Sequence, residues 1–241
     1  MSQTLLTSKL IRATGSGDVI DAAGRWLAAR PTLEGFTWIK TRRALEARHG
    51  SRRETLTFES SHHDRARQSI TFSAAAIEVT DTTLRAWRRE NPHRTLVRST
   101  GVEGIVCAAS LHDFGTGNSV NLAGPEKRVA RLEMVLAHLR EHALPWFATT
   151  ADPGVLPRDV PVSLLRPWGF AADMVEYLAV HGHIDAAREL VSRVRAQGPD
   201  HQAAFDEGRD LAKQLARPRW HTAPGLGWTA TTLGLADPQI D

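Results

Sequence analysis

The chain has 241 residues, 41% of them hydrophobic and 24% charged, which excludes a disordered chain and allows one large domain or two small ones. The formal net charge is only +3, so the whole-molecule charge is a weak argument for nucleic acid. Apolar runs are too short to span a bilayer, the first residues do not resemble a signal peptide, and the single cysteine, Cys107, excludes an intramolecular disulfide framework. We therefore expect a cytoplasmic protein.

The first 80 residues change from a helical to an alternating pattern. Apolar side chains recur at helical spacing over residues 19–30, and Pro31 ends the pattern. Strands are predicted from Phe36 onward, with a turn at residues 49–51. Apolar residues then alternate with polar ones up to residue 59, and again over residues 70–79. The pattern predicts three successive antiparallel strands, a β-meander.

The remaining residues are mainly helical in pattern. Asp81 is a predicted N-cap for a short helix that Pro92 closes, and residues 101–111 form an apolar run typical of a strand. A helix is predicted from Pro125 to about His142, followed by a proline-rich stretch, LPWFATTADPGVLPRDVP, that we expect to be irregular. A pair of helices over residues 170–197, a helix over residues 200–215 and a tail rich in Pro, Gly and Trp complete the chain.

These elements predict the α+β class: an N-terminal helix and an antiparallel meander sheet, packed against a helical C-terminal half. The expected division is an α+β sheet domain at residues 1–160 and a helical subdomain at residues 161–241. The pattern is also compatible with one continuous domain.

Five segments carry a resemblance to a known family. They are Gly35-Phe36, LTFESS, ITFSAAAIEV, LRAWRRENP and ALPWFATTADP. In order and spacing, over about residues 15–160, they resemble a bacterial α+β family described only as a domain of unknown function. Some members of such families occur among conflict and immunity proteins, so the resemblance implies a role of that kind. The shared motifs are structural, and the resemblance implies no catalytic residue.

The histidines are the first candidates for chemistry. His112 and Asp113 end an apolar strand and precede a glycine-containing loop, a common place for catalysis, although a strand-ending turn with His112 hydrogen-bonded at the edge of the core explains them better. His138 and His142 have the i, i+4 spacing that can place two imidazoles on one ion, but they lie at the flank of an apolar stripe. We therefore expect no metal and no cofactor. Cys107, within an apolar strand, is predicted to be a small core residue.

An arginine-rich meander is the second candidate. Arg48, Arg52 and Arg53 flank the predicted turn, and Arg65 and Arg67 lead into the next strand. Guanidinium groups bind phosphates, and they serve an acidic protein surface equally well. The aromatic residues nearby fall in the apolar phase of the strands, which disfavours a single-stranded nucleic-acid binder. A solvated sheet face without a ligand is the third interpretation.

The leading hypothesis is a non-enzymatic bacterial binding module, an immunity or defence protein that recognises another protein. The alternative is a nucleic-acid-associated protein or nuclease accessory that uses the arginine-rich face. A second alternative is an enzyme centred on His112 and Asp113. We expect a protein partner, with nucleic acid as the alternative, and no membrane association.

Overall fold

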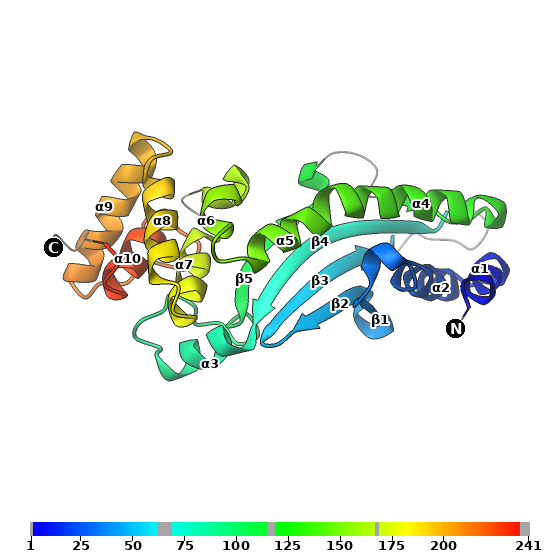
Figure 1. Cartoon of the computed structure of the whole chain (residues 1–241), viewed down its shortest axis with the longest axis horizontal. Helices are drawn as coiled ribbons and strands as arrows, with labels where there is room; N and C mark the ends of the chain where they lie inside the picture. Colours follow the sequence, from blue (N-terminus) through cyan, green and yellow to red (C-terminus); the bar gives the residue numbers. More distant parts are fainter. Residues whose placement is uncertain (1, 62–68, 115–118, 167–168, 237–241) are drawn as a thin grey trace. The chain divides into compact units, whose positions relative to one another are not determined.

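The computed structural model confirms the α+β class, with helices and an antiparallel sheet whose strand order is β1-β2-β3-β4-β5 and in which β6 pairs with β4 (Figure 1). The residues that the structure describes are 2–61, 69–114, 119–166 and 169–236. The chain divides into two compact units, which are unit 1 (Met1–Glu78 and Ala109–Phe147) and unit 2 (Val79–Ala108 and Ala148–Asp241). The boundary expected near residue 160 lies within unit 2, and the chain passes between the units along β4, β5 and α5.

The meander begins with a tight hairpin. Its strands pair antiparallel so that His49 lies opposite Arg52, leaving Gly50 and Ser51 as a two-residue loop. Gly50 has a φ of +62°, which a two-residue hairpin loop favours and which glycine adopts without strain. The predicted turn is therefore confirmed. The strands are β1 (Thr37–Ile39), β2 (Ala44–His49), β3 (Arg52–Glu59), β4 (Thr71–Asp81), β5 (Ile105–Ser110) and β6 (Ser119–Asn121).

One face of the meander carries the aromatic core of unit 1. Phe58 and Phe72 stack with ring centroids 4.8 Å apart, and Trp38 meets Phe58 edge-on at 5.8 Å. Ile70, two residues before Phe72, is also fully buried. Because side chains alternate along a strand, the residues between these point to the opposite face. Phe58, Ile70 and Phe72 are thus all buried, as the alternating pattern over residues 52–59 and 70–79 requires of one face.

Helices of unit 1 supply the rest of this core. Leu132, Val135 and Leu139 are fully buried, whereas Leu136 is only half-buried. Arg128 is also buried, because its guanidinium donates hydrogen bonds to the carbonyls of residues 10, 11, 13 and 122. The helices named here are α1 (Gln3–Arg12), α2 (Ser16–Ala28), α4 (Arg128–His138), the π-helical segment η5 (Leu139–Ala143) and α5 (Leu144–Ala151).

The prediction that the proline-rich stretch is irregular was wrong at its start. LPWFATTA forms α5, which continues from α4 through the π-helical turn η5. Pro145 lies directly after the π-helical turn and inside this continuous helix, where a proline removes one intrahelical hydrogen bond and is commonly accompanied by an irregular turn. Short 3₁₀ segments complete the chain, which are η1 (Pro31–Leu33), η2 (Lys40–Arg42), η3 (Leu111–Phe114), η4 (Pro125–Lys127) and η6 (Val162–Leu165).

Unit 2 is predominantly helical. Asp81 accepts a hydrogen bond from the Leu84 N–H at 2.7 Å, so the predicted N-cap of its first helix is confirmed. The expected tail contains a further helix, which packs so closely that a Cβ at Gly227 would lie 1.9 Å from the Phe205 carbonyl oxygen. The helices are α3 (Thr82–Glu90), α6 (Leu156–Asp159), α7 (Ala171–Val180), α8 (Ile184–Arg195), α9 (Pro199–Lys213) and α10 (Gly225–Thr232). Within the described ranges, every helix is too short or too polar to cross a bilayer.

Candidate functional site

The arginine-rich hairpin presents its side chains on two different faces of the sheet. Arg48 and Arg53 are direct cross-strand partners, so both project from the face opposite the aromatic core. Arg48 is exposed and Arg53 is half-buried. The remaining two arginines of the predicted set, Arg65 and Arg67, lie outside the described residues.

Arg52 points the other way, and its place in the predicted binding set needs correction. The residue is only 6% exposed. Its Nη2 donates to Glu54 Oε1 at 3.0 Å and to the Phe147 carbonyl at 2.9 Å. A one-residue step along a strand reverses the face, and Arg52 shares the phase of Leu56 and Phe58. It therefore ties β3 to α5 within the core of unit 1 and does not face a partner.

Carboxylates lie beneath the outward arginines. Arg42 Nη2 pairs with Glu46 Oε1 at 2.6 Å, and the Glu46 side chain is only 5% exposed. Burial raises the pKa of Glu78, on β4, against the attraction of Arg53, and the nearby Glu46 raises it further. We call Arg42, Arg48 and Arg53, with Glu46 and Glu78, the arginine face. Its exposed layer is cationic, the buried Glu46 holds the Arg42 guanidinium in place, and the half-buried Glu78 feels the charge of Arg53.

The arginine face lacks stacking aromatics. The aromatic residues of β1 to β4 are Trp38, Phe58 and Phe72, and on the core side Phe58 contacts each of the other two. Base stacking on aromatic rings is a main source of affinity for single-stranded nucleic acids. In the described strands the chemistry of this face is therefore hydrogen bonding and charge, without a stacking surface.

The histidine pair His138 and His142 lies against the 3₁₀ segment η3 in unit 1. Desolvation lowers the pKa of His138, as does the neighbouring His142, whereas a hydrogen bond to the Leu111 carbonyl opposes the shift. The ring centroids of His138 and His142 are 4.6 Å apart, and Phe114 stacks on His142 at 5.7 Å. Leu111 and Phe114 are the first and last residues of η3, and His112 and Asp113 lie between them.

The predicted polar site at His112 and Asp113 is less defined. His112 is exposed, and the side chain of Asp113 lies outside what the structure describes. The hypothesis of an enzyme centred on these two residues therefore stays a prediction. Cys107 is fully buried, which confirms the prediction of a small core residue.

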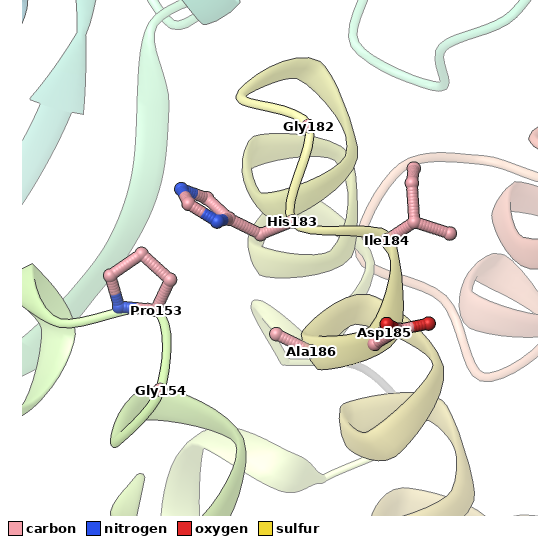
Figure 2. A pocket seen from close by; sticks show the side chains of 7 residues that line it. All are labelled: Pro153, Gly154, Gly182, His183, Ile184, Asp185 and Ala186. Carbon is pink, nitrogen blue, oxygen red and sulfur yellow. The ribbon is translucent and has the colours of Figure 1, made fainter.

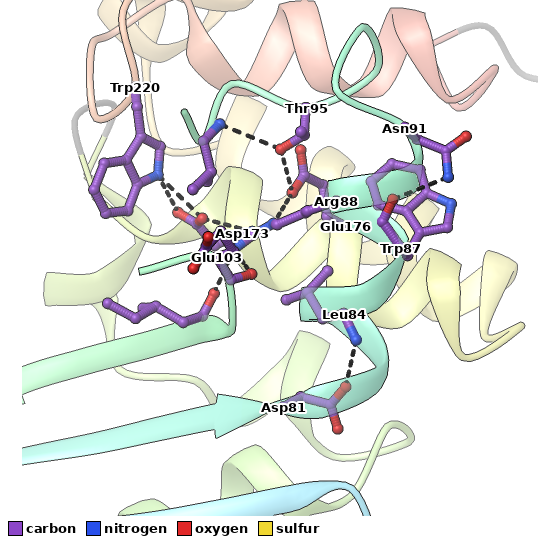
Figure 3. A network of polar contacts seen from close by, with 12 residues as sticks. Asp81, Leu84, Trp87, Arg88, Asn91, Thr95, Glu103, Asp173, Glu176 and Trp220 are labelled. Carbon is purple, nitrogen blue, oxygen red and sulfur yellow. Dashed lines mark hydrogen bonds and ion pairs between the residues drawn. The ribbon is translucent and has the colours of Figure 1, made fainter. Parts of the chain in front are cut away.

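Sequence reasoning missed a buried polar network in unit 2 (Figure 3). Arg88 Nη2 donates to Asp173 Oδ1 at 2.7 Å, and its Nε donates to Glu176 Oε2 at 2.7 Å. All three side chains are at most 2% exposed. The available signal was Asp173 and Glu176, two acids at i, i+3 within the otherwise apolar helix FAADMVEYLAV.

Further contacts complete the network around the two carboxylates. Trp220 Nε1 donates to Asp173 at 3.1 Å, His221 lies 3.3 Å from the same carboxylate, and the Thr95 hydroxyl donates to Glu176 at 3.2 Å. Burial raises the pKa of Glu176 to about 7, in spite of the attraction of Arg88. The network joins α3, α7 and the segment before α10, so we assign it a structural role in unit 2.

Two surface depressions lie apart from these residues. One, of about 290 Å³, lies in unit 2 between Pro153–Gly154 and the turn at residues 182–186, and His183 projects toward Pro153 (Figure 2). The other, of about 430 Å³, lies between α1 and α2 and carries Lys9, Asp18, Asp21 and Arg25. In both, the charged groups are dispersed or neutralise one another, which gives neither a clear ligand preference.

Comparisons with known proteins add no assignment: no family model, curated protein or solved structure matches this chain significantly. The function therefore has to be argued from the geometry of the described residues.

Proposed function

We propose that the chain is a non-enzymatic binding module whose arginine face recognises an acidic surface of another protein. The observation that carries the proposal is the direct opposition of Arg48 and Arg53 on adjacent strands. Like charges directly opposite each other destabilise an antiparallel pair. An acidic partner would relieve that repulsion on binding.

The layering of the arginine face supports a protein partner over nucleic acid. Glu46 and Glu78 lie under the guanidinium groups and reduce the positive field that a phosphate backbone would meet. The same carboxylates restrict the arginine side chains, which lowers the entropy lost when a partner binds. An acidic protein surface can use a few such placed guanidinium groups through bidentate pairs, whereas backbone binding depends on total charge.

The setting of this activity rests on the resemblance of residues 15–160 to a bacterial family with members among conflict and immunity proteins. We propose on that basis that the partner is a component of such a system and that recognition occurs in the cytoplasm. Nucleic-acid association through the same arginine face is the competing hypothesis.

The test measures binding of fluorescent polyglutamate and of a random DNA oligonucleotide of equal charge, by anisotropy at physiological salt. We expect the chain to bind polyglutamate more tightly than DNA. The Arg48→Ala/Arg53→Ala variant should weaken polyglutamate binding about tenfold or more, mainly through slower association. Its charge-matched control is Arg12→Ala/Arg219→Ala, which removes two exposed arginines outside the sheet.

Two results would contradict the proposal. Equal weakening in the control would show that only net charge matters. Tighter binding to DNA, lost in the Arg48→Ala/Arg53→Ala variant and falling linearly with salt on a log–log plot, would establish the nucleic-acid hypothesis instead.

A further inference from the structure

The histidine pair of unit 1 is placed by an unusual turn of helix. His138 is the last residue of α4, and His142 lies four residues later within the π-helical segment Leu139–Ala143. Single π-helical turns within α-helices are rare and are frequent at functional sites. Here the turn brings the two imidazole rings to a centroid separation of 4.6 Å. The same i, i+4 spacing serves helical histidine pairs that share one metal ion.

The two nitrogens of His138 are in different situations. Nε2 is buried and has no hydrogen-bond partner among the described residues. The hydrogen bond to the Leu111 carbonyl therefore comes from Nδ1, which donates its proton to the carbonyl oxygen. That bond sets the tautomer, so that Nε2 carries the free lone pair. A metal-ligating histidine has this arrangement, since its second nitrogen almost always donates to a carbonyl or carboxylate.

A buried polar nitrogen without a partner also calls for an explanation, because leaving it unpaired costs stability. The neighbouring ring is the imidazole of His142. Because the two rings are tilted, His142 does not donate a hydrogen bond to His138 Nε2, and the cost of burying this nitrogen unpaired remains. The rings are inclined by 61°, and Phe114 supports the far side of His142 by stacking at 5.7 Å. The pair is thus held in place by η3 on one side and by the helix on the other.

We propose that His138 and His142 together bind one divalent transition-metal ion, with water completing its coordination. Imidazole donors suit Zn²⁺, Ni²⁺ and Cu²⁺, whereas Mg²⁺ and Ca²⁺ prefer oxygen ligands. Glu141 Oε2 lies 3.9 Å from His142 Nε2, but the described residues contain no group of three or more His, Cys, Asp or Glu side chains placed to hold a metal ion, so water would have to supply the remaining ligands. The proposal replaces the expectation, drawn from sequence, of a pair at the flank of an apolar stripe that binds no metal. It is independent of the arginine face.

The test uses untagged, chelator-treated protein titrated with Zn²⁺ and with Cu²⁺ against a chromophoric indicator. We expect one equivalent of either ion to bind, and His142→Ala should weaken binding at least about tenfold, since even loss of an outer-sphere partner has an effect of that size. His142 is only partly buried and accepts substitution more readily than His138. His93→Ala, which removes an exposed histidine of unit 2, is the control and should leave binding unchanged.

A second measurement identifies the ligands directly. Electron paramagnetic resonance of the Cu²⁺-loaded chain should show hyperfine coupling to two imidazole nitrogens, reduced to one in His142→Ala. Circular dichroism confirms that each variant is folded. The proposal is overturned if the wild-type chain takes up less than one equivalent at an excess of Zn²⁺. It is equally overturned if His142→Ala and His93→Ala bind the metal alike, which would place the ion elsewhere.

Discussion

Replacing Arg88 by methionine tests the role of the buried network in unit 2. The Arg88 side chain is 1% exposed, and besides its two carboxylate partners it donates from Nη1 to the carbonyls of Glu103 and Ile105 at 3.0 and 2.9 Å. Methionine retains the apolar stem and removes all of these hydrogen bonds. The Arg88→Met variant thus isolates the guanidinium group from the packing of the side chain.

The expected loss of stability is large because the partners stay buried. Asp173 and Glu176 would remain as two carboxylates at 2% exposure without their shared cation. Removing one member of a buried ion pair typically costs about 3–5 kcal/mol, chiefly from the uncompensated charge. We therefore expect Arg88→Met to lower the free energy of unfolding of unit 2 by that amount. A further Glu176→Gln change should recover part of the loss, since without Arg88 the buried Glu176 must either stay charged or take up a proton on folding.

The assay follows unit 2 separately from the rest of the chain. Hydrogen exchange of α7 amides in increasing urea reports the local opening free energy without assuming a single two-state transition. Arg89→Met is the control, since that neighbouring side chain is 62% exposed and makes one ion pair at 3.3 Å, and it should change stability by less than about 1 kcal/mol. A loss in Arg88→Met no larger than in this control, or no recovery with Glu176→Gln, would refute the argument.

Three further predictions concern stability. Burial raises the pKa of Glu176 from 4.5 to about 7, so Glu176 keeps its proton to higher pH in the native state than in the unfolded state. The free energy of unfolding, measured by urea titration, should therefore fall as the pH rises from about 5 to 7, and Glu176→Gln should reduce this pH dependence. Gly227→Ala should lower the melting temperature through a clash equivalent to about 1–3 kcal/mol, whereas Gly17→Ala, with open space around its Cα, should not lower it. Phe72→Ala should cost about 3–5 kcal/mol in chemical unfolding, and an unchanged midpoint would contradict its place in the core.

The arginine hairpin shows how far local pattern alone could locate the candidate site. The alternation of Leu56 and Phe58 with polar residues already defines the core face of β3. Arg52 lies four residues, or two steps of the two-residue strand period, before Leu56, so the sequence already indicated that it points inward. Grouping it with Arg53 overlooked this two-residue period. The sequence could not predict that Glu78 lies near Arg53 and Glu46. Glu78 is on β4, 25 residues after Arg53, and only the pairing of the strands brings it close.

The histidine site depended on a contact between distant segments. The i, i+4 spacing of His138 and His142 was visible, but the sequence does not reveal that a carbonyl at position 111 orients His138. Nor did it reveal the π-helical turn, since a wider turn leaves the pattern of apolar residues nearly unchanged over so short a stretch. Because of these two features, a pair that the sequence placed at the flank of an apolar stripe becomes a candidate metal site.

What the sequence by itself determined are the elements whose causes are local: the α+β class, the hairpin turn at Gly50 and the N-cap at Asp81. Each follows from backbone geometry or side-chain periodicity within a few residues. Only the tertiary structure decided how Arg88 meets Asp173, 85 residues later, and how the glycines of α9 and α10 allow close packing. Such pairings are selected because a buried charge or a close helix crossing is stable only with its partner present, and the partner's distance along the chain leaves no local signal.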